Sequence, residues 1–278
     1  IDIELSTKGE YNNLYLYDDY IIEEIFPLNS NSINNLTNKI NYIKDTYLND
    51  NNNIYYTIIP DKNYFINNGN LKLNYNKLQD MMKNNLSNIN YINIFDKLTL
   101  DNYYKTDTHW KQEDLFDVAN TIANQMNFDI TNNNVVNTVT TFKGSYAGRL
   151  SVTKDIDTIK TISNPSTLNS SVYNYETKKY TQIYDYDKIK SLDKYDIYLS
   201  GASSIIDIVN PTSNSNRELI VFRDSYGSSL VPLLIEGYKK ITVVDIRYVS
   251  SRILNNYIKF KDQDVLFMYS ILTINNSF

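Results

Sequence analysis

The chain lacks cysteine altogether and has a single histidine, and both facts limit its chemistry. Without cysteine it can form no disulfide bond, no thiolate-ligated metal site and no cysteine nucleophile. One imidazole, that of His109, cannot build a multi-histidine metal site. A zinc or calcium site would need carboxylate ligands, and the acidic residues do not follow the spacing of an EF-hand loop. We therefore expect no bound metal.

Clusters of positive charge and long apolar runs are also missing. The 27 Lys and Arg residues are scattered among 32 Asp and Glu residues, and the net charge is −5. Neutralising nucleic-acid phosphates requires clustered basic residues, so this pattern argues against a nucleic-acid partner. No apolar run reaches the roughly 18 residues that a membrane-spanning helix needs.

The chain begins at Ile1, without an initiator methionine. This start is typical of a trimmed or processed form, and a removed signal peptide or anchor is one explanation that the sequence itself does not show. The absence of cysteine suits a protein that works outside a reducing cytosol. We expect an extracytoplasmic protein, exported or membrane-anchored through a segment absent from this chain.

Tyrosine is abundant, with 26 residues, and asparagine is more abundant still. One explanation is sugar recognition by aromatic faces and side-chain amides. The other is codon usage in an AT-rich genome, because Asn, Ile, Lys and Tyr all have AT-rich codons. We favour the codon explanation.

The pattern of apolar residues favours an α/β fold. Apolar residues recur at steps of three and four over 31–48, 75–86 and 110–126, which predicts amphipathic helices. Short apolar runs at 54–62 and 89–95 predict buried parallel strands. Helices that alternate with such strands are typical of βαβ units, in which helices cover a parallel sheet.

Two other segments predict β-structure of a different kind. Residues 11–29 predict one or two strands that turn at Asp18–Asp19. From about 131 to 196, apolar and polar residues alternate without a helical period, which predicts a β-rich insertion with a hairpin turning near Glu176–Lys179. No Gly- or Pro-rich linker bounds residues 131–196, so we expect an insertion within one domain of residues 1–278.

The α/β pattern returns after the insertion. It predicts, in order, a strand at 218–222, a helix at 226–238, a strand at 241–246, a helix at 248–258 and a strand at 264–270.

A polar turn, "RDSYG", follows the strand at 218–222. Ser225 in this turn lies between a strand and a helix start, at the sheet edge where open α/β sheets bind ligands. The amides at the helix start can stabilise an oxyanion there. Alternatively, Ser225 only caps the helix, and this segment alone favours that explanation.

His109 lies in "TDTHW", which follows the strand at 89–95 and precedes a helix. A serine hydroxyl is a poor nucleophile unless a base removes its proton and a third group orients that base. Asp107 is close enough in sequence to hold one ring nitrogen while the other faces a serine. A helix cap with a surface histidine explains the same residues equally well.

Three stretches together resemble a known family. They are "YYKTDTHW" at 103–110, "VFRDSYGSSLVPLL" at 221–234 and "VVDIRY" at 243–248. They look like the DHHW proteins of Gram-positive bacteria, relatives of the alginate O-acetyltransferases within the SGNH hydrolase superfamily. The resemblance extends from "IYYTIIPDK" at 54–62 to the final strand. It implies an SGNH-like, flavodoxin-like α/β domain of three layers, with a mostly parallel sheet and the β-rich insertion.

The resemblance also implies residue roles. Ser225 would be the nucleophile, His109 the general base and Asp107 the carboxylate that orients the base. The family has two adjacent histidines where this chain has Thr108-His109, and we take the second as the catalytic position. We expect Thr108 to be harmless.

The oxyanion donors and substrate contacts are less closely matched. In "YLSGASSII" only Gly201 matches a family stretch that supplies oxyanion donors, so the candidates are the Ser225 amide and either the Gly201 amide or the Ser203 hydroxyl. Arg247 ends a strand at the same rim, where it could bind an anionic sugar, hold the carboxylates of the site, or pair with a surface acid.

Three further residues lie near these motifs. Lys62 is a substrate candidate at the end of the strand at 54–62, and Tyr104 and Trp110 flank the histidine motif. Trp110 could be a sugar platform, but packing under the helix is the explanation that we favour.

The resemblance implies acyl-ester chemistry on a polysaccharide hydroxyl. Ser225 would take an acetyl group from a donor acting as co-substrate, with no other cofactor, and pass it to a sugar hydroxyl or to water. A membrane-bound acyl-transfer protein is an expected partner besides the polysaccharide acceptor. Transferase and esterase would use the same residues, so the sequence leaves both open. The alternative is a non-catalytic extracellular glycan-binding or assembly protein with a relic triad.

Overall fold

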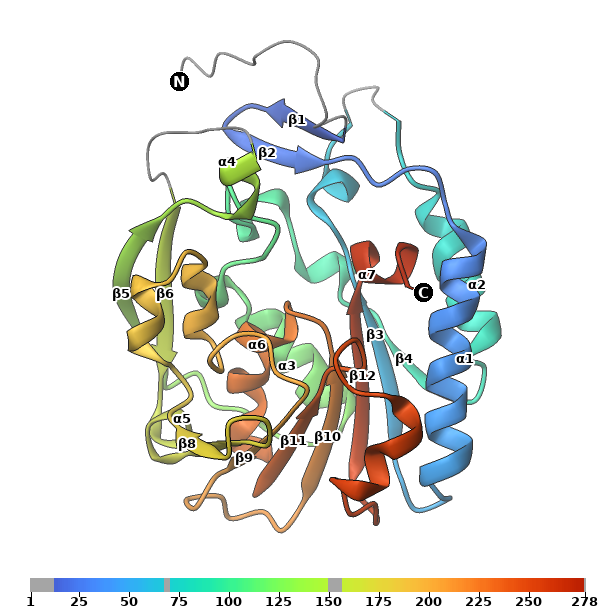
Figure 1. Cartoon of the computed structure of the whole chain (residues 1–278), viewed down its shortest axis with the longest axis vertical. Helices are drawn as coiled ribbons and strands as arrows, with labels where there is room; N and C mark the ends of the chain where they lie inside the picture. Colours follow the sequence, from blue (N-terminus) through green and yellow to red (C-terminus); the bar gives the residue numbers. More distant parts are fainter. Residues whose placement is uncertain (1–12, 68–70, 150–156, 278) are drawn as a thin grey trace.

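The computed structural model describes residues 13–67, 71–149 and 157–277 (Figure 1). Its main element is an eight-stranded sheet in the order β4-β3-β12-β10-β11-β9-β7-β8. The four pairs from β4 to β11 are parallel, and the three pairs from β11 to β8 are antiparallel. The expected α/β fold with a mostly parallel sheet is therefore confirmed. In sheet order the strands are Asn90–Ile92, Ile54–Ile59, Asp264–Ser270, Glu218–Arg223, Lys240–Val244, Ile205–Val209, Ser171–Asn174 and Lys179–Thr181.

Helices cover both faces of this sheet (Figure 1). One face carries α1 (Ser30–Tyr47), α2 (Tyr75–Asn85), α7 (Ile271–Asn275) and the 3₁₀ helix η8 (Ser251–Asn256). The other face carries α3 (Phe116–Gln125), α6 (Gly227–Leu230) and the 3₁₀ helix η7 (Val231–Gly237). These elements and the sheet form three layers, with one apolar core on each side.

The strand β12 shows how the sequence divides between the two cores. Leu266 and Met268 face the α3 side, whereas Val265, Phe267 and Tyr269 face the α1 side. Because β12 lies between β3 and β10 and is buried along its whole length, its sequence is largely apolar rather than alternating.

The helix α1 forms where the apolar spacing predicts it. Its buried positions at steps of three and four are Ile33, Leu36, Ile40 and Ile43. Asn29 caps its first turn, because the Asn29 side chain accepts a hydrogen bond from the Ser32 amide. The helix begins at Ser30, one residue before the predicted range of 31–48.

Three segments predicted as α-helices are partly 3₁₀ helices. Within 226–238, α6 ends at Leu230 and η7 continues with Pro232 near its start. Proline has no N–H and clashes with the preceding carbonyl, so the α-helix cannot continue through it. Within 248–258 only η8 forms, and within 110–126 a 3₁₀ turn (Gln112–Asp114) precedes α3.

The segment 131–196 is only partly the insertion that we expected. The strands β5 (Val135–Phe142) and β6 (Asp157–Ser163) form an antiparallel two-stranded sheet of their own. The strands β7 and β8 form a hairpin that turns before Lys179, as predicted, but β7 also pairs with β9 and so extends the main sheet. Residues 150–156 of this segment lie outside the described residues. Its helices are α4 (Ser145–Arg149) and α5 (Pro165–Asn169).

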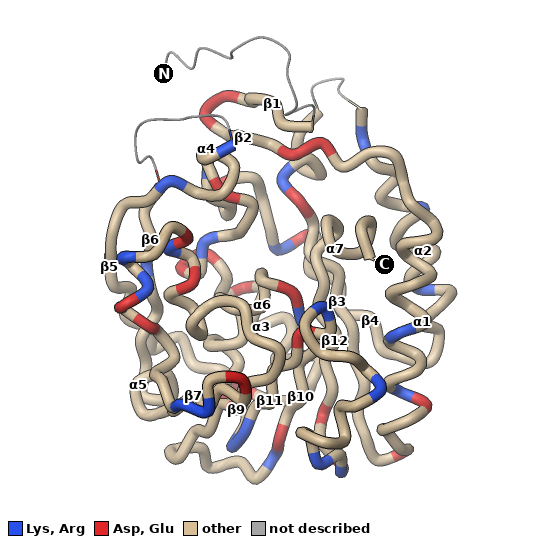
Figure 2. Tube along the Cα trace, in the orientation of Figure 1, with Lys and Arg blue, Asp and Glu red and all other residues tan. Residues whose placement is uncertain are grey.

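The opening segment forms a hairpin of β1 (Leu14–Tyr17) and β2 (Tyr20–Glu23) that turns at Asp18–Asp19, as predicted. None of the helices in the described part of the chain has the length and apolarity that crossing a bilayer requires. Acidic and basic residues are interspersed along the chain (Figure 2).

Polar residues gather where the parallel strands end. Asp61 follows β3, Ser225 follows β10, Asp245 follows β11, and Ser270 ends β12. Because the carboxyl ends of parallel strands share one edge of a sheet, these residues lie along one rim. This rim carries the candidate site.

The packing between β10 and β12 should dominate the stability of this rim. The Phe222 and Phe267 rings stack with centroids 4.7 Å apart in the α1-side core. We expect Phe267→Ala to lower the free energy of unfolding by about 3–5 kcal/mol, measured by urea denaturation of the full chain. The control Phe26→Ala removes a ring that is 49% exposed and should cost no more than about 0.5 kcal/mol. Equal losses in the two variants would contradict this assignment of the core.

Candidate active site

A short loop carries Asp107 and His109. Tyr103 and Trp110 form an isolated antiparallel bridge that closes this loop, and the Tyr104 amide donates to the His109 carbonyl. The Trp110 ring is fully buried, and its Nε1 donates to the Tyr226 carbonyl at 3.1 Å. Trp110 therefore ties the histidine loop to the turn that follows β10.

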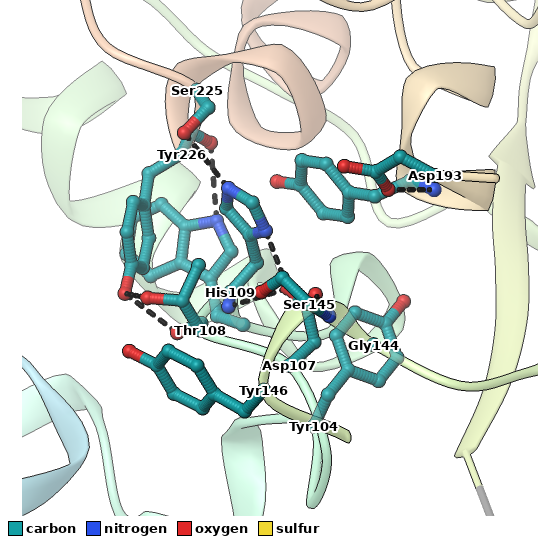
Figure 3. Close-up of polar contacts among 12 residues, drawn as sticks. Tyr104, Asp107, Thr108, His109, Gly144, Ser145, Tyr146, Asp193, Ser225 and Tyr226 are labelled. Carbon is teal, nitrogen blue, oxygen red and sulfur yellow. Dashed lines mark hydrogen bonds and ion pairs between the residues drawn. The ribbon is translucent and has the colours of Figure 1, made fainter. Parts of the chain in front are cut away.

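This arrangement places Asp107, His109 and Ser225 in one hydrogen-bonded line (Figure 3). His109 Nδ1 lies 2.5 Å from Asp107 Oδ1, and His109 Nε2 lies 2.8 Å from Ser225 Oγ. In this geometry the imidazole can accept the serine proton on Nε2 while Nδ1–H donates to the carboxylate. A serine far from the histidine would favour the non-catalytic, glycan-binding alternative. Ser225 instead lies within hydrogen-bond distance of His109.

The Asp107 carboxylate has no exposed surface, and donors meet both of its oxygens. The His109 amide donates to Oδ1 at 2.9 Å, and the Ser145 amide donates to Oδ2 at 2.7 Å. Burial alone would raise the pKa of Asp107, but the charge and hydrogen bonds of His109 and the Ser145 amide hold this pKa well below its usual value. Asp107 is therefore ionised at any pH near neutral.

Aromatic rings fix the plane of the His109 imidazole. The Tyr195 ring is stacked on it with centroids 3.8 Å apart, and the Tyr226 ring packs at a tilt of 57°. The Asp193 side chain accepts a hydrogen bond from the Tyr195 amide, which holds Tyr195 in place (Figure 3). These ring contacts, with the hydrogen bonds at both ring nitrogens, favour the one orientation that joins Asp107 to Ser225.

The turn at Ser225 is anchored by the residue before it. Asp224 is buried, and its Oδ2 accepts hydrogen bonds from the Ser270 amide at 2.8 Å and the Ser270 hydroxyl at 2.6 Å. Its Oδ1 accepts from the Tyr226 amide at 3.1 Å. Asp224 thus joins the ends of β10 and β12 and leaves the partly exposed Ser225 at the rim.

Comparison with solved structures identifies the fold. A DHHW family protein from Eubacterium siraeum superposes with a TM-score of 0.75 and 19% identity, over 97% of this chain and 94% of that chain. The structure of Bacillus cereus PatB1 with a sulfonyl adduct superposes with a TM-score of 0.72 and 17% identity, over 95% of this chain and 98% of that chain. The O-acetyltransferase domain of Pseudomonas putida AlgJ superposes with a TM-score of 0.58 and 11% identity, over 95% of this chain and 93% of that chain. The chain shares its fold with a DHHW family protein. No family model matches the chain, and no curated protein matches its sequence.

Thr108 occupies the position between Asp107 and His109. Its side-chain hydroxyl lies 3.1 Å from the Tyr226 hydroxyl, which also donates to the Thr108 carbonyl at 2.6 Å. Thr108 therefore contributes to the packing between the two motifs and takes no place in the line from Asp107 to Ser225.

Of the three oxyanion candidates, Gly201 is excluded. Its backbone has a positive φ of 82°, and its amide donates to the Tyr198 carbonyl at 3.1 Å, so this N–H is already engaged. The Ser203 hydroxyl accepts from Asn174 Nδ2 at 2.8 Å and keeps its own hydrogen to donate. The Ser225 amide has no acceptor among the described residues. Ser225 and Ser203 are the candidates that retain a donor.

Lys62 and Tyr104, which we considered as substrate contacts, lie in the interior, and Trp110 packs there as we favoured. All three are buried, with 3% or less of each residue exposed. The Tyr104 ring packs edge-on against Phe142, and Trp110 donates to backbone and to Ser229. Tyr104 and Trp110 pack inward because their loop is closed on itself, whereas the Lys62 ammonium donates to backbone carbonyls.

Arg247 forms a bidentate pair with Asp245, at 2.9 Å from Nε and 2.7 Å from Nη2. Asp245 is buried and lies also 3.6 Å from Arg223. Arg247 therefore holds a carboxylate at the rim. This carboxylate, that of Asp245, is buried, so the pair is not a salt bridge to a surface acid. No group of three or more potential metal-ligating side chains occurs in the described ranges.

Sequence reasoning missed the backbone that supports Asp107. Gly144 packs directly on it: a Cβ at Gly144 would lie within 2.6 Å of the Asp107 amide nitrogen. The next residue, Ser145, supplies the amide that bonds Oδ2. The only indication of this contact in the sequence is the glycine in "FKGSY", which no turn pattern explains.

A small cavity lies behind this loop, lined by Glu23, Asp61, Lys62, Thr108 and Tyr146, among others. Asp61 Oδ1 has no partner among the described residues, whereas Oδ2 accepts from Tyr75 and the Asn63 amide. Burial raises the pKa of Asp61 to about 6. Asp61 therefore carries a desolvated charge at neutral pH.

The contact between Gly144 and Asp107 gives a first test of the site. We expect Gly144→Ala to displace the Asp107 backbone and to lower the free energy of unfolding by about 1–3 kcal/mol. The imidazole NMR signals of His109, the sole histidine, should shift in the same variant. In Gly148→Ala the new methyl group meets nothing within 4 Å, so both readouts should stay close to wild type. Matching behaviour of the two variants would refute the contact.

The raised pKa of Asp61 gives a second test. The folded state holds the Asp61 proton more tightly than the unfolded chain does, so stability is lost as pH rises from about 4 to about 6. Asp61→Asn cannot ionise and should be more stable than wild type by about 2–3 kcal/mol at pH 7. Below about pH 4 the two proteins should unfold alike.

Urea denaturation as a function of pH measures this difference. The control is Asp187→Asn, which alters a side chain that is 93% exposed and should change stability little at any pH. A gain for Asp61→Asn that is equally large at pH 4 and pH 7 would show that ionisation is not its cause.

Proposed function

We propose that the chain is a serine-dependent acyltransferase of the SGNH-like type, which moves an acetyl group onto a polysaccharide hydroxyl through an acetyl ester on Ser225. The observation that carries this proposal is the line from Asp107 through His109 to Ser225, with distances of 2.5 Å and 2.8 Å. The shared fold with an O-acetyltransferase domain supports the choice of acyl group.

In the first step Ser225 Oγ attacks the carbonyl carbon of an acetyl donor, and His109 Nε2 takes the hydroxyl proton. The negative charge that develops on the carbonyl oxygen is met by the Ser225 amide, with the Ser203 hydroxyl as a second candidate. The tetrahedral intermediate then collapses, and the imidazolium returns its proton to the leaving group. Acetyl-Ser225 and the deacylated donor are the products of this step.

In the second step a hydroxyl of the acceptor gives its proton to His109 Nε2 and attacks the acetyl carbon. The bond to Ser225 Oγ breaks, and the serine recovers a proton from the imidazolium. In both steps the ionised Asp107 holds Nδ1–H and stabilises the imidazolium without taking up the proton itself. Water in place of the sugar hydroxyl would release acetate, and the protein would then be an acetylesterase.

This chemistry implies a donor, an acceptor, a location and a partner protein. The acetyl donor is a co-substrate, and no cofactor or metal is required. The acceptor is a cell-surface or secreted polysaccharide, in an extracytoplasmic location. A membrane-bound acyl-transfer protein would supply acetyl groups there. Nucleic acid has no part in this reaction.

Two reagents test this proposal together. An activated acetyl ester such as 4-nitrophenyl acetate measures turnover, and a sulfonyl fluoride measures the reactivity of the serine, since PatB1 has been obtained as a sulfonyl adduct. We expect Ser225→Ala and His109→Ala to lower turnover by at least about 10³-fold, because each removes a member of the unit. Both variants should also lose the rapid sulfonyl mass increase in intact-protein mass spectrometry, Ser225→Ala because the nucleophile is gone and His109→Ala because the serine is no longer activated.

Ser87→Ala is the matched control, because Ser87 is an exposed serine after α2. It should keep wild-type turnover and labelling. Turnover by Ser225→Ala at the wild-type rate would overturn the catalytic proposal and favour the glycan-binding alternative. Transfer is then separated from hydrolysis by supplying oligosaccharide acceptors and following acetylated sugar against free acetate.

A further inference from the structure

Lys62 is a buried cation directly behind the loop that carries Asp107. It follows β3 and begins the 3₁₀ helix η1 (Lys62–Phe65), which Asp61 caps. The residue is only 3% exposed, and every hydrogen bond that its ammonium makes to the described residues goes to a backbone carbonyl. A lysine so deeply buried needs a reason beyond packing, because lysine is among the residues least often buried.

The Lys62 ammonium joins two segments of the chain. Its Nζ lies 2.5 Å from the Ile21 carbonyl oxygen in β2, 3.0 Å from that of Tyr104 and 2.8 Å from that of Asp107. A fourth carbonyl, that of Lys105, lies at 3.5 Å. An ammonium has three N–H donors and no acceptor, so the three close carbonyls use it completely. Two of these carbonyls lie at the two ends of the segment 104–107.

The same segment is held from its other side. The amides of Lys105 and Thr106 donate to Asp157 at 2.8 Å and 2.7 Å, and the Tyr146 amide donates to the Thr106 carbonyl. Asp157 and Tyr146 thus bond the backbone of Lys105 and Thr106, and Lys62 supplies the donors for the carbonyls of Tyr104 and Asp107. Without them those carbonyls would be buried and unpaired, which forces the loop to move.

We propose that Lys62 is a positioning residue for the Asp107–His109 pair: its ammonium fixes both ends of the segment 104–107 and thereby the direction from which the Asp107 carboxylate meets the imidazole. This inference rests on the proposed function, in which Asp107 holds His109 Nδ1–H and so orients Nε2 toward Ser225. Lys62 acts through the Asp107 backbone and touches neither the imidazole nor the serine.

The number of donors makes this support depend on protonation. A neutral amine has two N–H donors and a lone pair, so one of the three carbonyls would face a lone pair instead of a hydrogen. Burial lowers the pKa of Lys62 to about 7, while nearby carboxylates, that of Asp107 foremost, act to raise it. Wild type therefore has the three-donor form below about pH 7 and the two-donor form above it.

Charged and titratable groups surround Lys62 on every element packed against it. They are Tyr20 and Glu23 in β2, Asp61 before η1, Lys105 and Asp107 in the loop, Asp157 in β6, and Tyr146 and Arg149 in α4. Of these, Asp61 also titrates near this range, so the test compares wild type and variant at each pH rather than following wild type alone.

The test uses Lys62→Met in the full chain, with Lys105→Met as the matched control. Lys105 lies on the same loop, but its ammonium pairs with the exposed Asp19 instead of holding loop carbonyls. At pH 6 we expect Lys62→Met to lower kcat for the activated acetyl ester on the order of 10–100-fold with little change in KM, since a small misplacement of a catalytic group has such effects. At pH 9 the ratio of wild-type to Lys62→Met kcat should be clearly smaller than at pH 6, because the wild-type amine has then lost one of its three donors. The Lys105→Met ratio should stay near one throughout.

A second readout does not depend on activity. The proton on His109 Nδ1, hydrogen-bonded to Asp107, gives a downfield NMR signal that belongs to one residue, because the chain has one histidine. At pH 6 this signal should be sharp in wild type and in Lys105→Met, and broadened or lost through faster exchange in Lys62→Met.

The outcomes separate the two proposals. A kcat ratio that is large at pH 6 and clearly smaller at pH 9, with the NMR signal weakened in Lys62→Met, supports positioning by the ammonium. A ratio that is constant with pH, or a Lys62→Met signal as sharp as wild type, overturns it and leaves Lys62 as a packing residue. If Ser225→Ala in the same series turns over ester like wild type, the proposed function fails, and the NMR comparison alone decides the role of Lys62.

Discussion

A carboxylate with no access to water must find hydrogen-bond donors for both oxygens, and Asp107 is such a carboxylate. Its donors are the ring and amide of His109 and the amide of Ser145. Because these donors come from the loop itself and from the start of α4, meeting the needs of one buried charge fixes two segments and the imidazole together. The hydrogen bonds from Trp110 to the turn after β10 then bring the second nitrogen of that imidazole to Ser225. The positions of Asp107 and His109 therefore depend also on Ser145 in α4 and on the turn after β10.

Local patterns predicted most of the fold. The helix α1 and the strands β3, β10, β11 and β12 follow from apolar periodicity, which depends only on neighbours in sequence. The strand β9 was missed, although Ile205–Val209 is an apolar run, and with it the pairing that draws β7 into the main sheet. Such pairing depends on which distant strand offers free edge groups, and a pattern in one segment does not contain that information. Pro232 did carry a local signal, and it sets the change from α6 to η7.

Residue chemistry predicted the three polar side chains that the structure brings together. With a single imidazole in the chain, any base-assisted serine had to meet His109, and acids near it in sequence were few. The supporting contacts could not be predicted in this way. The Ser145 amide and the carbonyls that Lys62 binds are backbone groups, present at every position whatever the side chain. The Gly201 amide was expected to be free, but a left-handed turn directs it to Tyr198. Backbone direction of this kind is decided by the tertiary fold.

The distance along the chain between the two motifs means that the unfolded chain has no assembled site. His109 and Ser225 are 116 residues apart, and they meet only once β10 lies in the sheet and Trp110 has bonded to the turn beside it. An unfolded chain holds an ordinary imidazole and an ordinary alcohol. The hydrogen-bonded line from Asp107 to Ser225 thus forms with the native state and is lost with it, so a chain still being synthesised, or one that has unfolded, has no contact between the imidazole and the serine.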